Sequence, residues 1–385
     1  MQLVLTAGAL AWALRRLARR GVPLLPRLLA LGLFALLPFY SVWGVCAHKD
    51  VPFAVLCMLF VLQLMDLPQA LRRPLGWKKA GRLAAFVLTA VLMLLMRRNG
   101  IYALLLCLPV CVPLTEKGLR CRMSLLLCLC IGLYVGADRL LIAASEAEDD
   151  PADTAVEMLS VPLQQLARAA RLHPEALAQE DWELLHTLYD GASPADYYSE
   201  TCSDPVKWAL SYDELDTGAL LGMWLRVLAR APFPCLEATL IQNLPYYLPG
   251  ASMPYYLDLG TRPIELYELE ARSLLPAWQR LLQEYDRTAS FAGLPLTRSL
   301  GDVGLHVWLC IALLGLSVYR RDRGMIVSCC FLLGIWLTCL LGPVAIVRYM
   351  LSFFYATPLL LAEAGWGKRN EKGLPGQTGQ PLETT

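Results

Sequence analysis

The stretch EAEDDPADTAVEMLSVPLQQ, residues 146–165, follows a series of apolar segments and begins an acidic region that runs to Leu300. Residues 146–300 hold 24 Asp and Glu against 10 Lys and Arg, a net charge of −14. The rest of the chain holds 24 Lys and Arg against 9 Asp and Glu, a net charge of +15. The overall charge of +1 therefore combines a basic part and an acidic part, which indicates a membrane protein with an aqueous insert.

The apolar residues outside the insert come in blocks. At 56% hydrophobic residues, the chain is too apolar for a soluble protein. The nine apolar runs are Gln2–Leu14, Leu28–Cys46, Val51–Met65, Leu83–Met96, Ile101–Leu114, Met123–Ala144, Val303–Val318, Met325–Leu341 and Ala345–Leu361. We expect an all-α polytopic membrane protein with eight or nine transmembrane helices and one large, mainly helical extracytoplasmic domain.

Basic residues gather in alternate connectors between these runs. Those connectors are 15–27, 71–82, 116–122, 320–323 and 368–372. The positive-inside rule puts all five in the cytoplasm and the acidic insert outside. The predicted organisation is a transmembrane bundle at 1–145, an extracytoplasmic domain at 146–300, further transmembrane helices at 301–366 and a disordered cytoplasmic tail at 367–385.

Two features depart from this alternation. Arg97-Arg98 forms a basic connector on the outer side, either as a turn between two short helices or within a re-entrant hairpin at Leu83–Leu114. The first run has only 13 residues before Arg15, although the alternation places Met1 outside. We therefore expect that the chain starts late and that the beginning of its first helix is missing.

Helical periodicity and Pro positions predict four helices in the insert. They are Ala155–Leu172, a helix beginning at Pro174, Thr217–Ala231 and Ala271–Arg287. The insert also contains two cysteines, Cys202 and Cys235. These can form a disulfide outside the cytoplasm or remain two free thiols.

Four cationic residues are predicted near the outer face, where positive charge is otherwise avoided: Lys49, Arg97, Arg98 and Arg348. Such a cluster suits a lipid-linked phosphate, because Lys and Arg stabilise anionic oxygens best where water is scarce. The alternative for each residue is snorkelling to lipid headgroups. Asp50 also has a structural alternative, as the N-cap of the helix that contains Pro52.

Other chemistries lack their motifs. The chain has no Cys-x-x-Cys, and no His or carboxylate accompanies Cys107 and Cys111, so the sequence does not favour a zinc site. It has no glycine-rich phosphate loop, no dinucleotide fingerprint and no nucleic-acid module.

Several motifs resemble GT-C-type membrane glycosyltransferases, and in particular an uncharacterised bacterial multi-pass family of that superclass. The similar segments are KDVPF at 49–53, RRNGIY at 97–102, EMLSVPLQQ at 157–165, SDPVK at 203–207 and RY at 348–349. The resemblance covers nearly the whole chain. It implies a protein of the bacterial plasma membrane that moves a sugar from a polyprenyl-phosphate donor to a cell-envelope glycan or lipid acceptor on the outer face, with inversion.

The resemblance also assigns roles. Lys49, Arg97, Arg98 and Arg348 would bind the donor phosphate, and Asp50 would support acceptor or metal binding, which leaves room for a divalent cation. The further candidates for substrate binding are His48, Asn99, Gln164, Gln165, Asp204, Lys207 and Tyr349. The superclass carries its catalytic carboxylate in the first outer loop, which this sequence lacks. The chain would then bind a lipid-linked sugar without catalysing its transfer.

Two other classes of function remain open. An O-antigen polymerase- or ligase-like protein also has a large outer loop and outer-face Arg residues, although the quoted segments favour the transferase. A non-enzymatic transporter or partner-binding protein is the other alternative. A transporter predicts polar residues at the bilayer midplane and inverted repeats, and the sequence has neither.

Overall fold

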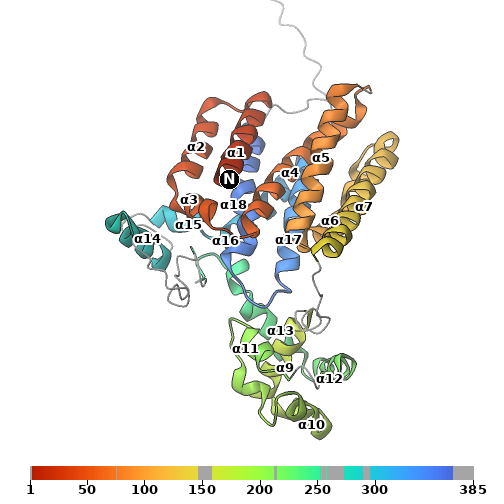
Figure 1. Cartoon of the computed structure of the whole chain (residues 1–385), viewed down its shortest axis with the longest axis vertical. Helices are drawn as coiled ribbons and strands as arrows, with labels where there is room; N and C mark the ends of the chain where they lie inside the picture. Colours follow the sequence, from red (N-terminus) through yellow and green to blue (C-terminus); the bar gives the residue numbers. More distant parts are fainter. Residues whose placement is uncertain are drawn as a thin grey trace, which may run out of the picture.

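The computed structural model describes residues 2–366 apart from 75, 146–157, 212–214, 252, 254–256, 258–272 and 289–294. The tail predicted at 367–385 and the start of the helix predicted at 155 lie outside these residues. The described part contains seventeen α-helices and no strand, which confirms the all-α prediction. A helical bundle forms one end of the molecule and most of the insert forms the other (Figure 1).

Ten of the described helices lie outside the insert and form the bundle, and two of them, α2 and α3, form one bent pair. They are α1 (Gln2–Arg19), α2 (Leu24–Leu36), α3 (Pro38–Val45), α4 (Asp50–Arg72), α5 (Trp77–Met96), α6 (Asn99–Leu114), α7 (Arg120–Ser145), α16 (Val303–Tyr319), α17 (Arg323–Cys339) and α18 (Leu351–Trp366). The bend of 57° lies at Leu37, which is extended because it precedes Pro38.

Several of these helices are long and apolar enough to cross a membrane. Three segments of the described chain qualify by length and composition: α4, α5 and Lys117–Ser145. If each of two bent helix pairs is counted as one span, the described residues contain up to five candidate spans. The second pair, bent by 106°, joins two helices of the insert. These long apolar helices indicate a multi-pass membrane protein.

Helix α4 is the centre of the bundle and α7 is at its edge. About two thirds of the apolar window of α4 is buried, against 17% for the segment that contains α7. Helices α5, α17 and α18 pack around α4, and α17 also packs closely on α6. That approach depends on Gly334, where an added Cβ would lie 3.2 Å from Cα of Ala103.

Ion pairs show which connectors share an end of the bundle. Arg16 contacts Asp66 and Glu363, and Arg72 contacts Glu116, so the basic connectors 15–27, 71–82 and 116–122 lie together. Arg320 donates to the carbonyl of Ala364 at the same end. This end is opposite the insert (Figure 1), as the alternating charge pattern predicts.

Helices α5 and α6 both run between the two ends of the bundle. Lys79, at the start of α5, donates to the carbonyls of Leu71 and Arg73, whereas Arg97, just after α5, contacts Asp50 at the insert end. Helix α6 then returns to Glu116 and its partner Arg72. The connector Arg97-Arg98 is therefore a turn at the insert end of the bundle.

The insert has its own apolar core in its first part. Its helices are α9 (Ser160–Leu172), α10 (Gln179–Leu188), α11 (Asp204–Trp208), α12 (Thr217–Arg230), α13 (Pro232–Gln242), α14 (Pro276–Thr288) and α15 (Pro295–Leu300). Leu163, Leu185 and Val227 belong to this core, whereas Tyr246 and Tyr285 belong to the core of the bundle. The later part of the insert thus packs on the bundle.

Two of the predicted insert helices begin later than expected, and a further helix was not predicted. Pro174 begins a short 3-10 turn, and α10 follows at Gln179. Helix α14 begins at Pro276, five residues later than predicted. The sequence analysis did not predict α13, although Pro232 and Pro234 fit its first turn, where a missing N–H costs nothing. Cys202 and Cys235 are both free thiols.

Candidate functional site

Asp50, Arg97 and Arg348 come together at the insert end of the bundle, and we call these three residues the Arg97 cluster. Nη1 of Arg97 lies 2.9 Å from Oδ1 of Asp50, and Nε of Arg348 lies 3.6 Å from Oδ2. The Asp50 side chain is only 5% exposed. The three residues come from the start of α4, the α5–α6 turn and the segment before α18, so only the tertiary fold unites them.

Asp50 is the first residue of α4, and Lys49 occupies the N-cap position without a side-chain capping bond. The predicted capping role of Asp50 is therefore wrong. Its carboxylate lies between two guanidinium groups, where it compensates their charges and fixes their spacing.

Aromatic rings pack against the guanidinium groups of both arginines. The guanidinium carbon of Arg97 lies 4.3 Å from the ring centroid of Tyr349 and 5.8 Å from that of Phe53, while that of Arg348 lies 5.4 Å from Tyr349. A cation over an aromatic face is attracted to it without losing all its hydrogen-bond donors. Tyr349, a predicted substrate-binding residue, thus contacts both arginines.

The other candidates of the bundle follow or precede Asp50 and Arg97 in the chain. Lys49 and Arg98 are exposed and adjoin Asp50 and Arg97 in the chain. The His48 ring lies 6.3 Å from the Trp43 ring. Asn99 donates to Oγ1 of Thr338 at 3.4 Å, which links α6 to α17.

The candidates in the insert are placed elsewhere and connect its helices. Nε2 of Gln164 donates to the carbonyl of Ser199, and Gln165 bonds both Thr239 and the indole of Trp224. These two glutamines are buried. Their contacts tie α9 to α12 and α13, and none of them reaches the Arg97 cluster.

Asp204 and Lys207 form an ion pair within α11, with Nζ 3.1 Å from Oδ1. Lys207 is buried and Asp204 occupies the first turn of the helix, where a negative charge is favourable. The structure thus brings Asp50, Arg97, Arg348 and Tyr349 together, with Lys49 and Arg98 beside them, and gives the four insert residues contacts within the insert.

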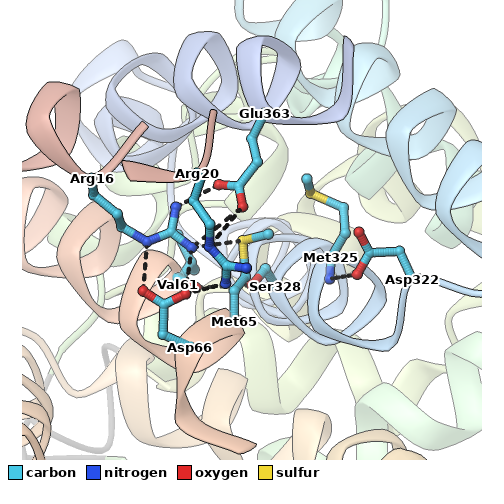
Figure 2. A network of polar contacts seen from close by, with 9 residues as sticks. All are labelled: Arg16, Arg20, Val61, Met65, Asp66, Asp322, Met325, Ser328 and Glu363. Carbon is cyan, nitrogen blue, oxygen red and sulfur yellow. Dashed lines mark hydrogen bonds and ion pairs between the residues drawn. The ribbon is translucent and has the colours of Figure 1, made fainter. Parts of the chain in front are cut away.

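Sequence reasoning missed a second ionic group, which lies at the opposite end of the bundle. Arg16, Arg20, Asp66 and Glu363 join α1, α4 and α18, and we call them the Arg16 cluster (Figure 2). Nε and Nη2 of Arg16 lie 2.8 and 2.9 Å from the Asp66 carboxylate, and Arg16 also contacts Glu363. The sequence signal that could have identified Asp66 and Glu363 is a carboxylate at the end of an apolar run.

A third group has two arginines around one carboxylate but lies in the core of the insert. Asp181 is fully buried and accepts from Arg226 at 2.5 Å, Arg230 at 3.1 Å and the amide of Ala178 at 3.0 Å. Burial by itself raises the pKa of Asp181, but these contacts outweigh it, so the pKa lies below its ordinary value. This group fixes α10 against α12.

Among the described residues, no three His, Cys, Asp or Glu side chains converge in a way that could hold a metal ion. The Arg97 cluster itself offers guanidinium donors around a buried carboxylate.

The chain was compared with protein families, curated proteins and solved structures. The model of a family of unknown function, DUF6020, matches residues 1–374. The chain belongs to the DUF6020 family. No curated protein and no solved structure matches it. The description of DUF6020 names no activity and makes no link to the GT-C superclass.

Proposed function

We propose that this DUF6020 protein is a membrane glycosyltransferase-like protein that binds a polyprenyl-phosphate-linked sugar at the Arg97 cluster. The observation that carries the proposal is the gathering of two guanidiniums from distant parts of the chain around one buried carboxylate. Phosphate oxygens suit this geometry, because guanidinium groups bind them with short, charge-assisted hydrogen bonds.

The position of the Arg97 cluster also favours a lipid-borne anion. It lies at the ends of apolar helices, next to the insert, and the exposed Lys49 and Arg98 adjoin it. In this proposal the bundle crosses a bacterial plasma membrane eight or nine times and the insert lies outside. A polyprenyl chain would remain among lipids while its phosphate meets the arginines.

Each residue of the Arg97 cluster has its own role in the proposed sugar transfer. Arg97 and Arg348 hold the phosphate and stabilise its charge as the bond to the sugar breaks. Asp50 is a positioning residue, since both of its oxygens face the arginines. The acceptor is a glycan or lipid of the cell envelope, and the base that takes the proton from its hydroxyl is not assigned among the described residues.

Binding of a polyprenyl phosphate tests the proposal directly. The full chain, in phosphatidylcholine nanodiscs, should bind polyprenyl phosphate at least about tenfold more tightly than the uncharged polyprenol, because one charged hydrogen-bonded group contributes about 1.5–3 kcal/mol. Arg97→Ala should remove this preference. Arg72→Ala is the matched control, because Arg72 is exposed and lies at the other end of the bundle. Equal binding of the two lipids by the unaltered chain contradicts the proposal.

Transfer of the sugar needs its own assay. A radiolabelled polyprenyl-phosphate sugar is incubated with the nanodiscs and an envelope extract, and labelled product is measured. Label in the acceptor that disappears with Arg97→Ala supports a transferase. Binding of the lipid without any label in an acceptor supports a protein that binds the donor and catalyses nothing.

A further inference from the structure

Four carbonyl groups in the segment before Arg348 accept hydrogen bonds from outside the segment. Residues 339–347, CLLGPVAIV, run from the last residue of α17 to Arg348 and contain no polar side chain other than the Cys339 thiol. Buried carbonyl and amide groups in such a segment need partners from elsewhere, because a lost hydrogen bond costs about 1–3 kcal/mol each.

The insert supplies those partners. Nδ2 of Asn243 donates to the carbonyl of Leu340 at 2.9 Å, and Nε2 of Gln242 donates to that of Gly342 at 2.8 Å. The carbonyl of Pro343 accepts from both the amide and the hydroxyl of Ser203, at 2.8 and 3.1 Å.

Tyr246 closes the set beside Arg348. Its hydroxyl donates to the carbonyl of Ile346 at 3.1 Å and accepts from the amide of the same residue at 3.0 Å. Tyr246 itself is held by Trp336 of α17, whose indole donates to its carbonyl at 3.1 Å. Ser203, Gln242, Asn243 and Tyr246 are all buried, so the insert side of these contacts is shielded from water.

The other face of the same segment leads to the Arg97 cluster. Two residues after Ile346, Arg348 contacts Asp50, and Sγ of Cys339 donates to the carbonyl of Tyr349 at 3.7 Å. The segment 340–346 therefore lies between the insert and the arginines. A shift of the insert must move Arg348 or break these bonds.

We propose that the insert regulates the anion site by positioning Arg348, with Ser203, Gln242, Asn243 and Tyr246 as the positioning residues. Loosening of the insert's contacts releases the segment 340–346 and lowers the affinity for the lipid phosphate. The identity of that anion rests on the proposed function, whereas the placement of the segment does not.

Two substitutions test this while conserving size. Tyr246→Phe removes only the hydroxyl, and Asn243→Asp replaces the donor to Leu340 by an acceptor. Each should raise amide hydrogen exchange in the peptide covering residues 340–349 and weaken polyprenyl phosphate binding roughly three- to tenfold, the range of one hydrogen bond. Tyr247→Phe is the matched control, because the Tyr247 hydroxyl bonds the carbonyl of Leu240 within the insert. It should change neither readout.

The two readouts separate the two proposals. Hydrogen exchange is measured by mass spectrometry on the full chain in nanodiscs without polyprenyl phosphate, so it reports the segment alone. Unchanged exchange at 340–349 in both variants, or raised exchange with unaltered lipid affinity, overturns the positioning role. If the unaltered chain does not distinguish polyprenyl phosphate from polyprenol, the proposed function fails, and the exchange comparison still decides whether the insert holds the segment.

Discussion

The Arg16 cluster and the Arg97 cluster lie at opposite ends of α4 and α18 and differ in charge balance. The Arg16 cluster has two arginines and two carboxylates, Asp66 and Glu363, and Arg16 itself is 3% exposed. The Arg97 cluster has two arginines and one carboxylate, and the Arg348 side chain is 31% exposed. Both clusters reach the surface, at Asp66 and at Arg348, but the four residues of the first are neutral in sum, whereas the three residues of the second carry a net charge of +1.

The difference indicates separate tasks for similar residues. A neutral set of ion pairs joins helices and has no excess charge for a ligand. The three residues of the Arg97 cluster carry one more positive charge than negative, and under the proposed function the anion that binds there is the lipid phosphate. The number of arginines per carboxylate does not by itself identify an anion site, because Asp181 with Arg226 and Arg230 has the same two-to-one ratio in the core of the insert.

The largest expected effect is the loss of Arg16. Arg16→Ala leaves Glu363 and Asp66 with Arg20 as their partner, so the loss should approach but not exceed the cost of breaking a fully buried ion pair from one side, which is about 3–5 kcal/mol. The apparent melting temperature in detergent, followed by tryptophan fluorescence, should fall clearly. Arg72→Ala, at the exposed pair with Glu116, should cost no more than about 1 kcal/mol. Equal losses in the two variants would mean that the Arg16 cluster is only a surface contact.

A smaller loss of stability, which a lipid phosphate should partly restore, is expected at the Arg97 cluster. Asp50→Asn removes the charge between Arg97 and Arg348 and should destabilise the protein by about 1–3 kcal/mol. A lipid phosphate can take the place of the missing carboxylate. Added polyprenyl phosphate should therefore restore part of the melting temperature of Asp50→Asn, because a ligand of the folded state stabilises it.

The same lipid should raise the melting temperature of Arg16→Ala only as much as that of the unaltered chain, since its Arg97 cluster is intact and its Arg16 cluster gains no anion site. Polyprenol serves as the uncharged control in both variants. Equal rescue of the two variants, or rescue by polyprenol as well, contradicts an anion site that is specific to the Arg97 cluster.

The charge pattern of the sequence predicted the end of the bundle at which Arg97 and Arg348 lie. Positive residues on the side that otherwise avoids them are a local signal, and the connectors set the side. Asp50 was identified because it follows Lys49, but its partners Arg97 and Arg348 lie far from it in the sequence. The sequence therefore identified the members of the Arg97 cluster without their contacts.

The remaining site residues needed the tertiary structure. Gln164 and Gln165 belong to a specific motif, yet their partners are in the insert, and no sequence pattern distinguishes a buried glutamine that binds a helix from one that binds a sugar. Arg16 was counted with the exposed basic connectors, although its partner Glu363 is 347 residues away. Tyr246 had no signal because its role is set by the backbone of Ile346.

The insert provides a pH test of the third ionic group. The pKa of Asp181 lies below its ordinary value of 3.8, so its contribution to stability is fully present above that pH. The contribution is lost as the pH falls below 3.8 toward the folded-state pKa. Hydrogen exchange in α10 and α12 should therefore be unchanged between pH 7 and 5, after correction for the intrinsic rate, and should rise only in stronger acid. Asp181→Asn should exchange faster already at pH 7. A rise between pH 7 and 5 in the unaltered chain contradicts this assignment.

The smallest expected effect is at Arg98, which adjoins Arg97 but is exposed. Its charge acts through water, where salt screens interactions beyond about 8 Å at physiological ionic strength. Arg98→Ala should weaken polyprenyl phosphate binding by less than about threefold, since an exposed ion pair contributes about 0.2–1 kcal/mol. The difference should vanish in about 1 M salt, where the screening length is about 3 Å, whereas the loss in Arg97→Ala should persist. If Arg98→Ala weakens binding as much as Arg97→Ala, and does so at high salt too, the phosphate site includes the exposed turn rather than the buried carboxylate and its two arginines.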